Sequence, residues 1–165
     1  MKILNSKILI TGSNRGIGLA LAKEMAQRKA HLHLQMRSED PHISKELLTL
    51  GASSVKIWLI DLSKRQHIDQ WLPDLQKENI DILINNAGQL TGGLIENQNI
   101  DEIYSMFQVN VNALVHLTHG LLPGMLKRKK GKIVNHSSVS AIMHFPCAST
   151  YAASKAAVLA FTDCL

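Results

Sequence analysis

Short apolar runs and longer amphipathic stretches alternate along this chain. The runs at 8–10, 30–36, 55–60, 80–84 and 131–135 predict five strands, and the stretches at 15–29, 41–50, 65–78 and 99–130 predict helices between them. A last stretch, 149–165, is rich in helix-forming residues. Strands that alternate with helices are typical of a parallel sheet with helices on both faces. The pattern therefore predicts an α/β fold of the doubly wound Rossmann type, and the length of the chain predicts that 1–165 form a single domain.

Two segments fit this pattern less well. The second strand reads H-L-H-L-Q at 31–35, which is unusually polar for a buried parallel strand. The long helix at 99–130 contains Gly120 and the pair Pro123-Gly124, so we expect an interruption there. The same helix carries two asparagines, Asn110 and Asn112, and periodicity alone does not tell which of them faces inward.

Glycines cluster between the first strand and the first helix. Gly12, Gly16 and Gly18 have the spacing G-x-x-x-G-x-G, which differs from the best-known dinucleotide fingerprint, G-x-G-x-x-G. Glycines permit a sharp turn and a close approach of phosphate to the backbone, and the N-terminus of the following helix attracts anions. The alternative is a purely structural turn. We favour a cofactor-binding turn made by Gly12, Ser13, Asn14, Arg15, Gly16, Ile17 and Gly18.

The residues after the second strand bear on the choice of cofactor. In dinucleotide folds an acidic side chain here binds the ribose hydroxyls of NAD, whereas a basic one accommodates the 2′-phosphate of NADP. This chain has Arg37 here and Arg15 in the glycine turn, which favours NADP(H) over NAD(H). Glu39 and Asp40 lie close by, and either arginine could instead be solvated.

Polar residues also follow the later strands. Asp61-Leu62 ends the third strand, where Asp61 has a simple interpretation in turn chemistry, with Ser63 as the N-cap of the next helix. Asn86, Ala87 and Gly88 follow the fourth strand; they suit the close approach of a flat cofactor, although a generic turn would need no function. His136-Ser137-Ser138 follows the fifth strand, and ligands of open α/β sheets bind at this edge.

Tyr151 and Lys155 are four residues apart in Y-A-A-S-K, which places them on one helix face about 5–6 Å apart at Cβ. A free tyrosine loses its proton near pH 10, so an acid–base role near neutrality needs a positive charge beside the phenol. Lys155 supplies that charge, although burial works in the opposite direction. We interpret this pair as the centre of a proton-transfer site.

With these residues in view, the chain resembles the short-chain dehydrogenase/reductase family, and within it the members that are like bacterial 3-oxoacyl-carrier-protein reductases. The matching pieces span nearly the whole chain: Thr11 to Gly18, Asp61-Leu62, Asn86-Ala87-Gly88, Asn110, Ser138 and Tyr151-x-x-x-Lys155. The resemblance implies an NADP(H)-dependent oxidoreductase that interconverts a carbonyl and an alcohol of a small molecule. It also implies that Asp61 contacts the adenine and that the molecule forms a homodimer or homotetramer through the two long helices.

The resemblance also implies a role for each catalytic residue. Tyr151 would donate or accept the substrate proton, and Ser138 would bind the substrate oxygen. Lys155 would favour the tyrosinate and hold the nicotinamide ribose, while Asn110 would help to keep a water in the proton relay. The neighbouring histidines 136 and 144 are interpreted as non-catalytic, with 143–145 expected to line the substrate cleft.

Composition excludes several other classes. The net charge of +5 is not strongly patterned; the one dense basic run, 127–130, ends a helix, where cations are favourable, so we expect no nucleic-acid partner. The two cysteines form neither a disulfide framework nor a metal motif. No apolar run reaches signal-peptide or transmembrane length, so we expect a cytoplasmic protein with no membrane partner.

The resemblance fails at the C-terminal end. Members of the family continue with a sixth strand and a segment that covers the substrate, so we expect this chain to be a fragment that lacks its last strands. The strand at 132–135 would then be a sheet edge, and Ala157, Val158 and Phe161 would lie uncovered. A second hypothesis remains, in which the chain is a truncated, non-catalytic nucleotide-binding or partner-binding module. The complete set of four catalytic residues favours the enzyme.

Overall fold

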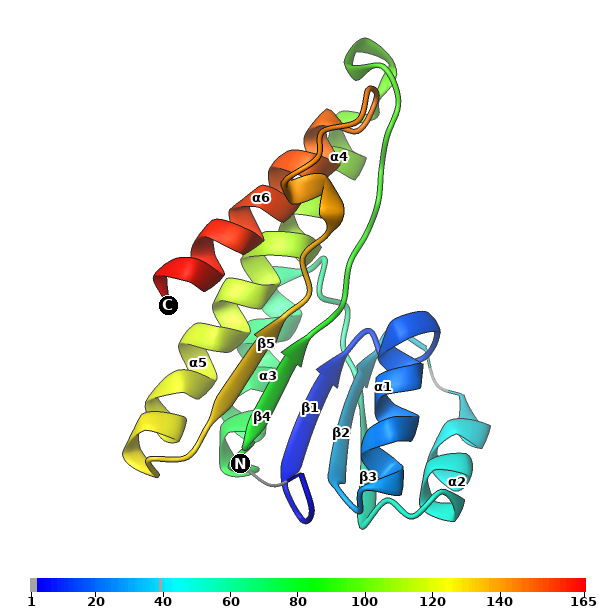
Figure 1. Cartoon of the computed structure of the whole chain (residues 1–165), viewed down its shortest axis with the longest axis vertical. Helices are drawn as coiled ribbons and strands as arrows, with labels where there is room; N and C mark the ends of the chain where they lie inside the picture. The colour runs from blue at the N-terminus through cyan, green and yellow to red at the C-terminus, as the bar shows by residue number, and fades with distance from the viewer. Residues whose placement is uncertain (1–2, 39) are drawn as a thin grey trace.

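Figure 1 shows a computed structural model of the chain, in which residues 3–38 and 40–165 are described. They form one parallel five-stranded sheet in the order β3-β2-β1-β4-β5. The strands are β1 (Lys7–Thr11), β2 (His31–Met36), β3 (Ser54–Leu59), β4 (Ile82–Asn85) and β5 (Lys132–Asn135). The helices are α1 (Gly16–Gln27), α2 (Pro41–Thr49), α3 (Arg65–Lys77), α4 (Ile100–Phe107), α5 (Ala113–Lys127) and α6 (Ser149–Cys164). The predicted doubly wound α/β fold is confirmed, because every predicted strand forms and helices cover both faces of the sheet.

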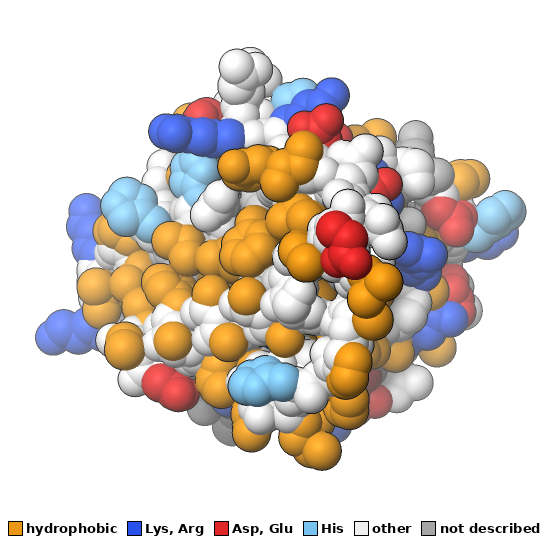
Figure 2. Space-filling model, turned by 90° about the horizontal axis from the view of Figure 1, so that it is seen from above, with side chains coloured by type: hydrophobic (Ala, Val, Ile, Leu, Met, Phe, Trp, Pro, Cys, Tyr) orange, Lys and Arg blue, Asp and Glu red, His pale blue; other side chains and the backbone are white. Residues whose placement is uncertain are grey.

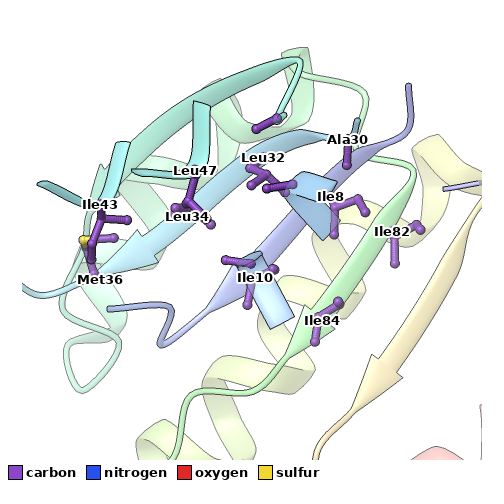
Figure 3. Packing of buried hydrophobic residues seen from close by; sticks show 13 residues of the cluster. Ile8, Ile10, Ala30, Leu32, Leu34, Met36, Ile43, Leu47, Ile82 and Ile84 are labelled. Carbon is purple, nitrogen blue, oxygen red and sulfur yellow. The ribbon is translucent and has the colours of Figure 1, made fainter. Parts of the chain in front are cut away.

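The two faces of the sheet are built by alternating residues of the same strands. Ile8 and Ile10 of β1 pack into one apolar cluster with residues of α1 and α2. The residue between them, Leu9, points to the other face and packs with α3 and α5. Figure 3 shows the first cluster, in which side chains of β1, β2 and β4 meet those of α2. Burial on both faces explains why the central strands read as unbroken apolar runs.

The strand order places a crevice at the carboxyl ends of β1 and β4. The chain winds outward from β1 through β2 to β3, and then crosses back to β4 on the other side of β1. Such a reversal leaves the loops after the two adjacent strands pointing to opposite faces, which opens a space between them. The glycine turn follows β1, and Asn86 follows β4, so both border this space.

The long helix predicted at 99–130 is divided elsewhere than expected. It is interrupted by a π-helical turn at Gln108–Asn112, which separates α4 from α5. The interruption predicted near Gly120 and Pro123 was wrong, because α5 continues through both residues to Lys127. Gly120 has another purpose there: a Cβ would overlap the Leu72 side chain, so its absence lets α5 pack closely on α3.

The C-terminal part of the sheet is an edge, as predicted. β5 pairs only with β4 among the described strands, and α6 packs beside it. The expectation that Val158 lies uncovered was wrong, since it is fully buried, while Ala157 and Phe161 are half-buried. α6 also contacts the π-helical turn and α4, and these neighbours cover its inner side.

The basic run at 127–130 is partly used inside the fold. Arg128 donates from Nη2 to the carbonyl of Ile80 at 2.7 Å, and from Nη1 to Oδ1 of Asn79 at 3.1 Å. Lys130 forms an ion pair with the buried Asp81, with 3.0 Å between Nζ and Oδ2. These contacts fasten the turn before β5 to the start of β4.

Candidate active site

A cleft of about 830 Å³ runs along the carboxyl ends of the strands. It brings together fourteen of the seventeen residues that the sequence predicts for the site. Those that line it are Gly12, Asn14, Arg15, Gly16, Ile17, Arg37, Asp61, Leu62, Asn86, Ala87, Gly88, Ser138, Tyr151 and Lys155. The other three, Ser13, Gly18 and Asn110, are buried behind the cleft wall. Residues separated by more than 100 positions in the sequence therefore share one surface.

The glycine turn is required by both geometry and space. Gly12 has φ +64°, and a Cβ there would lie 2.9 Å from Cα of Ala87. A Cβ on Gly18 would overlap the carbonyl oxygen of Gly12 and the side chain of Asn86. Gly16 differs, because its φ is +56° but a Cβ would meet none of the described atoms within 4 Å. Gly12 and Gly18 thus serve close packing, whereas Gly16 faces open space in the cleft.

The N-terminus of α1 is available to an anion. Within the described chain, Arg15 occupies the N-cap position without a side-chain hydrogen bond, and the first turn holds no acidic residue. The backbone N–H groups of a first helical turn carry partial positive charge and lack partners inside the helix. Asn14, Gly16 and Ile17 of this turn line the cleft. A dinucleotide pyrophosphate fits this position by both charge and space.

Gln35, which the sequence analysis noted only as an unusually polar strand residue, positions the glycine turn. Its buried side chain accepts from N of Gly12 at 3.0 Å and donates to the carbonyl of Ile60 at 2.6 Å. Its own carbonyl accepts from N and Oγ of Ser13, at 3.1 and 3.0 Å. A buried amide needs such partners, so a lone Gln in a buried strand is the signal that could have identified it.

Asn86 fastens the end of β4 to the end of β1. Its Nδ2 donates to the carbonyls of Thr11 and Gly12, at 2.9 and 3.2 Å. The Thr11 hydroxyl accepts in return from the backbone N of Asn86 at 3.0 Å and of Ala87 at 2.9 Å. The floor of the cleft is therefore a hydrogen-bonded junction between the two central strands.

The charged residues at this end of the cleft are Arg15, Arg37 and Asp61. Both arginines are exposed and line the cleft. Burial acts to raise the pKa of the Asp61 carboxyl, but hydrogen bonds from Ser63 (2.7 Å from Oγ, 3.0 Å from N) and the charges of Lys64 and Arg37 lower it below its usual value. These bonds show the turn chemistry expected for Asp61.

The structure also shows which residue caps α3 and how the acidic residue Asp40, close to Arg37 in the sequence, is used. The N-cap of α3 is Lys64, so the prediction of Ser63 at that position was wrong; Ser63 instead closes the turn with Asp61. Asp40 caps α2 by accepting from N of His42 at 2.9 Å. Glu39 lies outside the described residues. Asp40 is thus engaged in its own helix rather than with the arginines.

At the other end of the cleft, Lys155 is a buried cation. It is 5% exposed, and its Nζ lies 5.9 Å from the centre of the Tyr151 ring, one turn earlier on α6. It donates one hydrogen bond, to the carbonyl of His136 at 3.0 Å. Burial lowers the pKa of the Lys155 ammonium group. No carboxylate of the described residues lies within 4 Å of it, so a ligand with acceptor oxygens would satisfy its remaining N–H groups.

Ser138 and Ser137 end β5 with different contacts. Oγ of Ser138 accepts from N of Ser140 at 3.1 Å and caps the short turn Val139–Ala141, while its hydroxyl hydrogen stays available for a ligand. Oγ of Ser137 donates to the carbonyl of Lys155 at 2.9 Å and fastens α6 to the strand. Both serines line the cleft, but the hydroxyl hydrogen of Ser137 is used in a structural contact, whereas that of Ser138 is not.

Asn110 is buried in the π-helical turn, whereas Asn112 is exposed, which decides the question left open by the sequence. The Asn110 side chain accepts from N of Gln89 at 2.7 Å and donates to its carbonyl at 2.9 Å. It also donates to Oγ of Ser154 at 3.0 Å, and Ser154 donates to the carbonyl of Tyr151 at 2.7 Å. Asn110 therefore joins the loop after β4 to the helix that carries Tyr151 and Lys155.

Across residues 3–38 and 40–165, no helix combines the length and the apolar character needed to cross a membrane. The same part of the chain contains no group of three or more His, Cys, Asp or Glu side chains that could hold a metal ion.

Comparison with known proteins gives the family. The chain is 32% identical to an uncharacterized oxidoreductase of Staphylococcus aureus strain MRSA252, over 99% of its own length and 71% of that protein. It is similar to the solved structure of a short-chain dehydrogenase from Sphingobium yanoikuyae in complex with NADPH, with 29% identity, a TM-score of 0.92 and coverage of 97% and 64% of the two chains. A metagenomic short-chain oxidoreductase in complex with NADP is 25% identical, with a TM-score of 0.92 and coverage of 99% and 75%.

The two solved structures share the fold of this chain, and the whole described site falls within the region that matches the family. The sequence pattern of the family described as short chain dehydrogenase matches residues 6–165, which includes the glycine turn, the π-helical turn and α6. We conclude that this chain belongs to the short chain dehydrogenase family.

Proposed function

We propose that this chain forms the cofactor-binding and catalytic region of an NADP(H)-dependent oxidoreductase that interconverts a carbonyl and an alcohol. One observation carries the proposal: a single cleft joins an anion-binding helix N-terminus to a tyrosine, a serine and a buried lysine. The first end suits a pyrophosphate, and the second offers the proton donor and the cation that reduction of a carbonyl requires. A nicotinamide cofactor, when bound, supplies or accepts the hydride.

The choice of NADP(H) rests on charge. Arg15 and Arg37 are exposed at the end of the cleft near α1, where guanidinium groups can bind a 2′-phosphate by paired hydrogen bonds. The nearest described carboxylates, Asp40 and Asp61, already accept hydrogen bonds within their own turns. Two of the solved relatives contain NADP or NADPH, which supports the same choice.

The roles at the other end follow from the contacts of each side chain. Tyr151 gives its phenolic proton to the substrate oxygen in reduction and takes it back in oxidation. The Lys155 ammonium, 5.9 Å from the ring centre, attracts the resulting phenolate by about 3 kcal/mol in an effective dielectric of about 20. Ser138 donates its hydroxyl hydrogen to the developing alkoxide.

Asn110 acts through position rather than through contact with the substrate. Its side-chain amide is engaged with Gln89 and Ser154, so any water of a proton relay would be held by other atoms of the π-helical turn. By fixing Ser154, Asn110 holds the α6 segment of Tyr151 against the loop after β4.

The rim of the cleft supports a substrate with an apolar body. Figure 2 views the molecule from the end where the cleft opens, and hydrophobic side chains gather across it. Leu90 and Val139 belong to the cleft wall and are also exposed. Further exposed apolar residues lie in the same two segments of the chain, outside the cleft lining itself: Leu94, Ile95, Ile142, Met143 and Phe145. A sugar-like substrate would leave these apolar side chains exposed to water, whereas an aliphatic or aromatic ketone would bury them.

A homodimer or homotetramer is part of the same proposal. Ile100 and Tyr104 of α4 are 59% and 71% exposed, and α4 belongs to the first of the two segments, 99–130 and 149–165, expected to make this contact. Two apolar side chains one turn apart on a helix face are suited to packing against another helix. Light scattering of the purified chain measures the mass directly, and a monomer at all concentrations would contradict this part of the proposal.

Cofactor binding is the first test. The purified chain is titrated with NADPH and, separately, with NADH, and the nicotinamide fluorescence is followed. We expect saturable binding with a preference for NADPH. Tyr151→Phe should bind NADPH as tightly as the wild type while reduction of apolar ketones falls about 10³-fold. Absence of binding to either cofactor would contradict the proposal, and equal turnover by the variant would contradict the role of Tyr151.

A further inference from the structure

His136 is a cleft residue to which the mechanism above gives no role. It directly follows β5, where its backbone N donates to the carbonyl of Asn85 at 2.9 Å. Its side chain is half-buried in the cleft wall between Asn86 and Lys155. It therefore lies where the two ends of the cleft meet.

The neighbours of His136 fix which ring nitrogen carries the hydrogen. Nδ1 of His136 lies 3.1 Å from Oδ1 of Asn86. The orientation of that amide is settled, because its other atom, Nδ2, must be a donor to reach the carbonyls of Thr11 and Gly12. Oδ1 of Asn86 can only accept, so Nδ1 of His136 is the N–H donor. In the neutral ring the free lone pair is then on Nε2.

Nε2 of His136 is accessible from the cleft. It has no hydrogen-bond partner among the described residues. Three side-chain atoms of these residues are both buried and without a partner, and Nε2 of His136 is not one of them: Trp71 Nε1, Asn85 Oδ1 and Arg128 Nε. An unpartnered Nε2 that is absent from this buried set is exposed. Burial, followed by the charge of Lys155, lowers the pKa of the His136 ring below its usual value, which favours the neutral ring. An acceptor thus faces the cleft.

His136 and Lys155 offer an acceptor and a donor on the same wall of the cleft. Lys155 can only donate, and neutral Nε2 of His136 can only accept, while the carbonyl of His136 already holds Nζ of Lys155 at 3.0 Å. A phosphate has acceptors alone and would leave Nε2 unsatisfied. A hydroxyl group both donates and accepts, so it can satisfy the two side chains together.

Resting on the function proposed above, we propose that Nε2 of His136 accepts a hydrogen bond from a hydroxyl of the nicotinamide ribose of the bound cofactor. His136 is then a cofactor-binding residue, in addition to its contact with Asn86. Its ring connects the nicotinamide end of the cleft to the junction below the glycine turn through Asn86.

Two substitutions separate the ligand contact from the structural one. His136→Asn places an N–H donor near the position of Nδ1 and has nothing at the position of Nε2. His136→Gln does the reverse, because its longer side chain carries an acceptor to the position of Nε2. We expect His136→Gln to bind NADPH within about threefold of the wild type and His136→Asn to bind about tenfold more weakly. The reverse order, or equal affinities, would overturn the proposal.

Adenosine 2′,5′-bisphosphate serves as the control ligand, because it has the adenine-side phosphates but no nicotinamide ribose. All three proteins should bind it equally if the substitutions leave the fold intact. If the wild type binds neither this compound nor NADPH, the proposed function fails and the His136 contact fails with it. If the wild type binds both but NADPH affinity does not change in the variants, only the His136 contact fails.

The tautomer has an independent readout. In the ¹⁵N spectrum of the imidazole groups, His136 of the free protein should show a protonated Nδ1 and an unprotonated Nε2. Addition of NADPH should shift Nε2, whereas adenosine 2′,5′-bisphosphate should leave it unchanged. A protonated Nε2 in the free protein, or a shift that is the same with both compounds, would overturn the proposal.

Discussion

The two ends of the cleft are supported in different ways. The glycine turn follows β1 at the centre of the sheet, where Ile8 and Ile10 have no exposed surface and the neighbouring strands lie on both sides. The Ser138–Tyr151 end follows β5 at the sheet edge, where Val134 is 40% exposed. Buried apolar strands support the first end in addition to the hydrogen bonds of Gln35 and Asn86. The second end lies at the sheet edge and depends more on side-chain hydrogen bonds to α6 and the π-helical turn. Loss of one hydrogen-bonding residue should therefore affect the second end without disturbing the first.

The largest effect is expected from a substitution that removes the hydrogen bonds supporting the Ser138–Tyr151 end of the cleft. Asn110→Ala removes three hydrogen bonds, two to the backbone N–H and carbonyl of Gln89 and one to the hydroxyl of Ser154. We therefore expect it to lower the free energy of unfolding by about 3 kcal/mol. Urea denaturation measures this change. The control is Asn112→Ala, in the same turn but exposed, which should change the free energy by about 0.5 kcal/mol or less. Equal effects of the two substitutions would contradict the support assigned to Asn110.

The next largest effect is expected from a substitution in the glycine turn. Gly18→Ala puts a Cβ against the carbonyl of Gly12 and the Asn86 side chain, so we expect NADPH affinity to fall about 100-fold in the fluorescence titration. Gly124→Ala in α5 is the control, because its Cβ would meet only the flexible end of Arg128 at 3.1 Å. Wild-type affinity in the Gly18 variant would show that the close packing of the turn is unnecessary.

The central part of the sheet also contains a buried titratable residue, His33 of β2, which makes stability depend on pH. Burial lowers the pKa of His33 from 6.5 to about 4. Between these pH values the unfolded chain binds a proton that the folded chain does not, so the free energy of unfolding falls as the pH falls from about 6.5 towards 4. We expect a loss of about 2 kcal/mol between pH 7 and 4.5 from this residue, measured by urea denaturation.

Two variants identify His33 as the source. His33→Asn cannot titrate, so its stability should change less over this pH range, although its amide can still accept from Nε1 of Trp58. Trp58→Phe removes that donor, which lies 3.3 Å from Nδ1 of His33, but leaves the histidine buried and should retain the pH dependence. An unchanged pH dependence in His33→Asn would assign the effect to other groups.

The smallest effect concerns the choice of cofactor at the first end. Arg37→Ala should reduce the preference for NADPH over NADH about tenfold, because one guanidinium near the 2′-phosphate is lost. Arg28 is the matched control, since it is also exposed but is bound to Glu24 at 2.6 Å and does not line the cleft. A preference that survives in Arg37→Ala would leave Arg15 as the residue that selects the cofactor.

Local patterns were sufficient for most of the fold. Strands β1, β2, β4 and the helices between them appear within two residues of their predicted limits, because apolar runs and helical periodicity act over short distances. The limits of the long helix were not predictable in this way. Gly120 looks like a helix breaker in sequence, but its missing Cβ serves contact with Leu72 of α3, which is far away in the chain.

The candidate site also combines features that follow from local sequence with features that depend on distant contacts. Tyr151 and Lys155 were predictable as a pair, because helical geometry alone brings them together. The hydrogen-bond partners of Gln35 and Ser154 were not, since they lie more than 20 residues away: Gly12 in one case and Asn110 in the other. Such partners depend on how strands and helices pack, and single-sequence periodicity carries no information about them.

The sequence by itself determined the family, the order of the elements and the residues at the carboxyl ends of the strands. These follow from local periodicity, from the steric freedom of glycine and from fixed spacings within one helix. Only the tertiary structure decided that Asn110 faces inward, that Asn86 hydrogen-bonds to the end of β1 below the turn and that Nδ1 of His136 lies against Asn86. These facts arise from hydrogen bonds between distant segments, whose partners exist only when the sheet has formed.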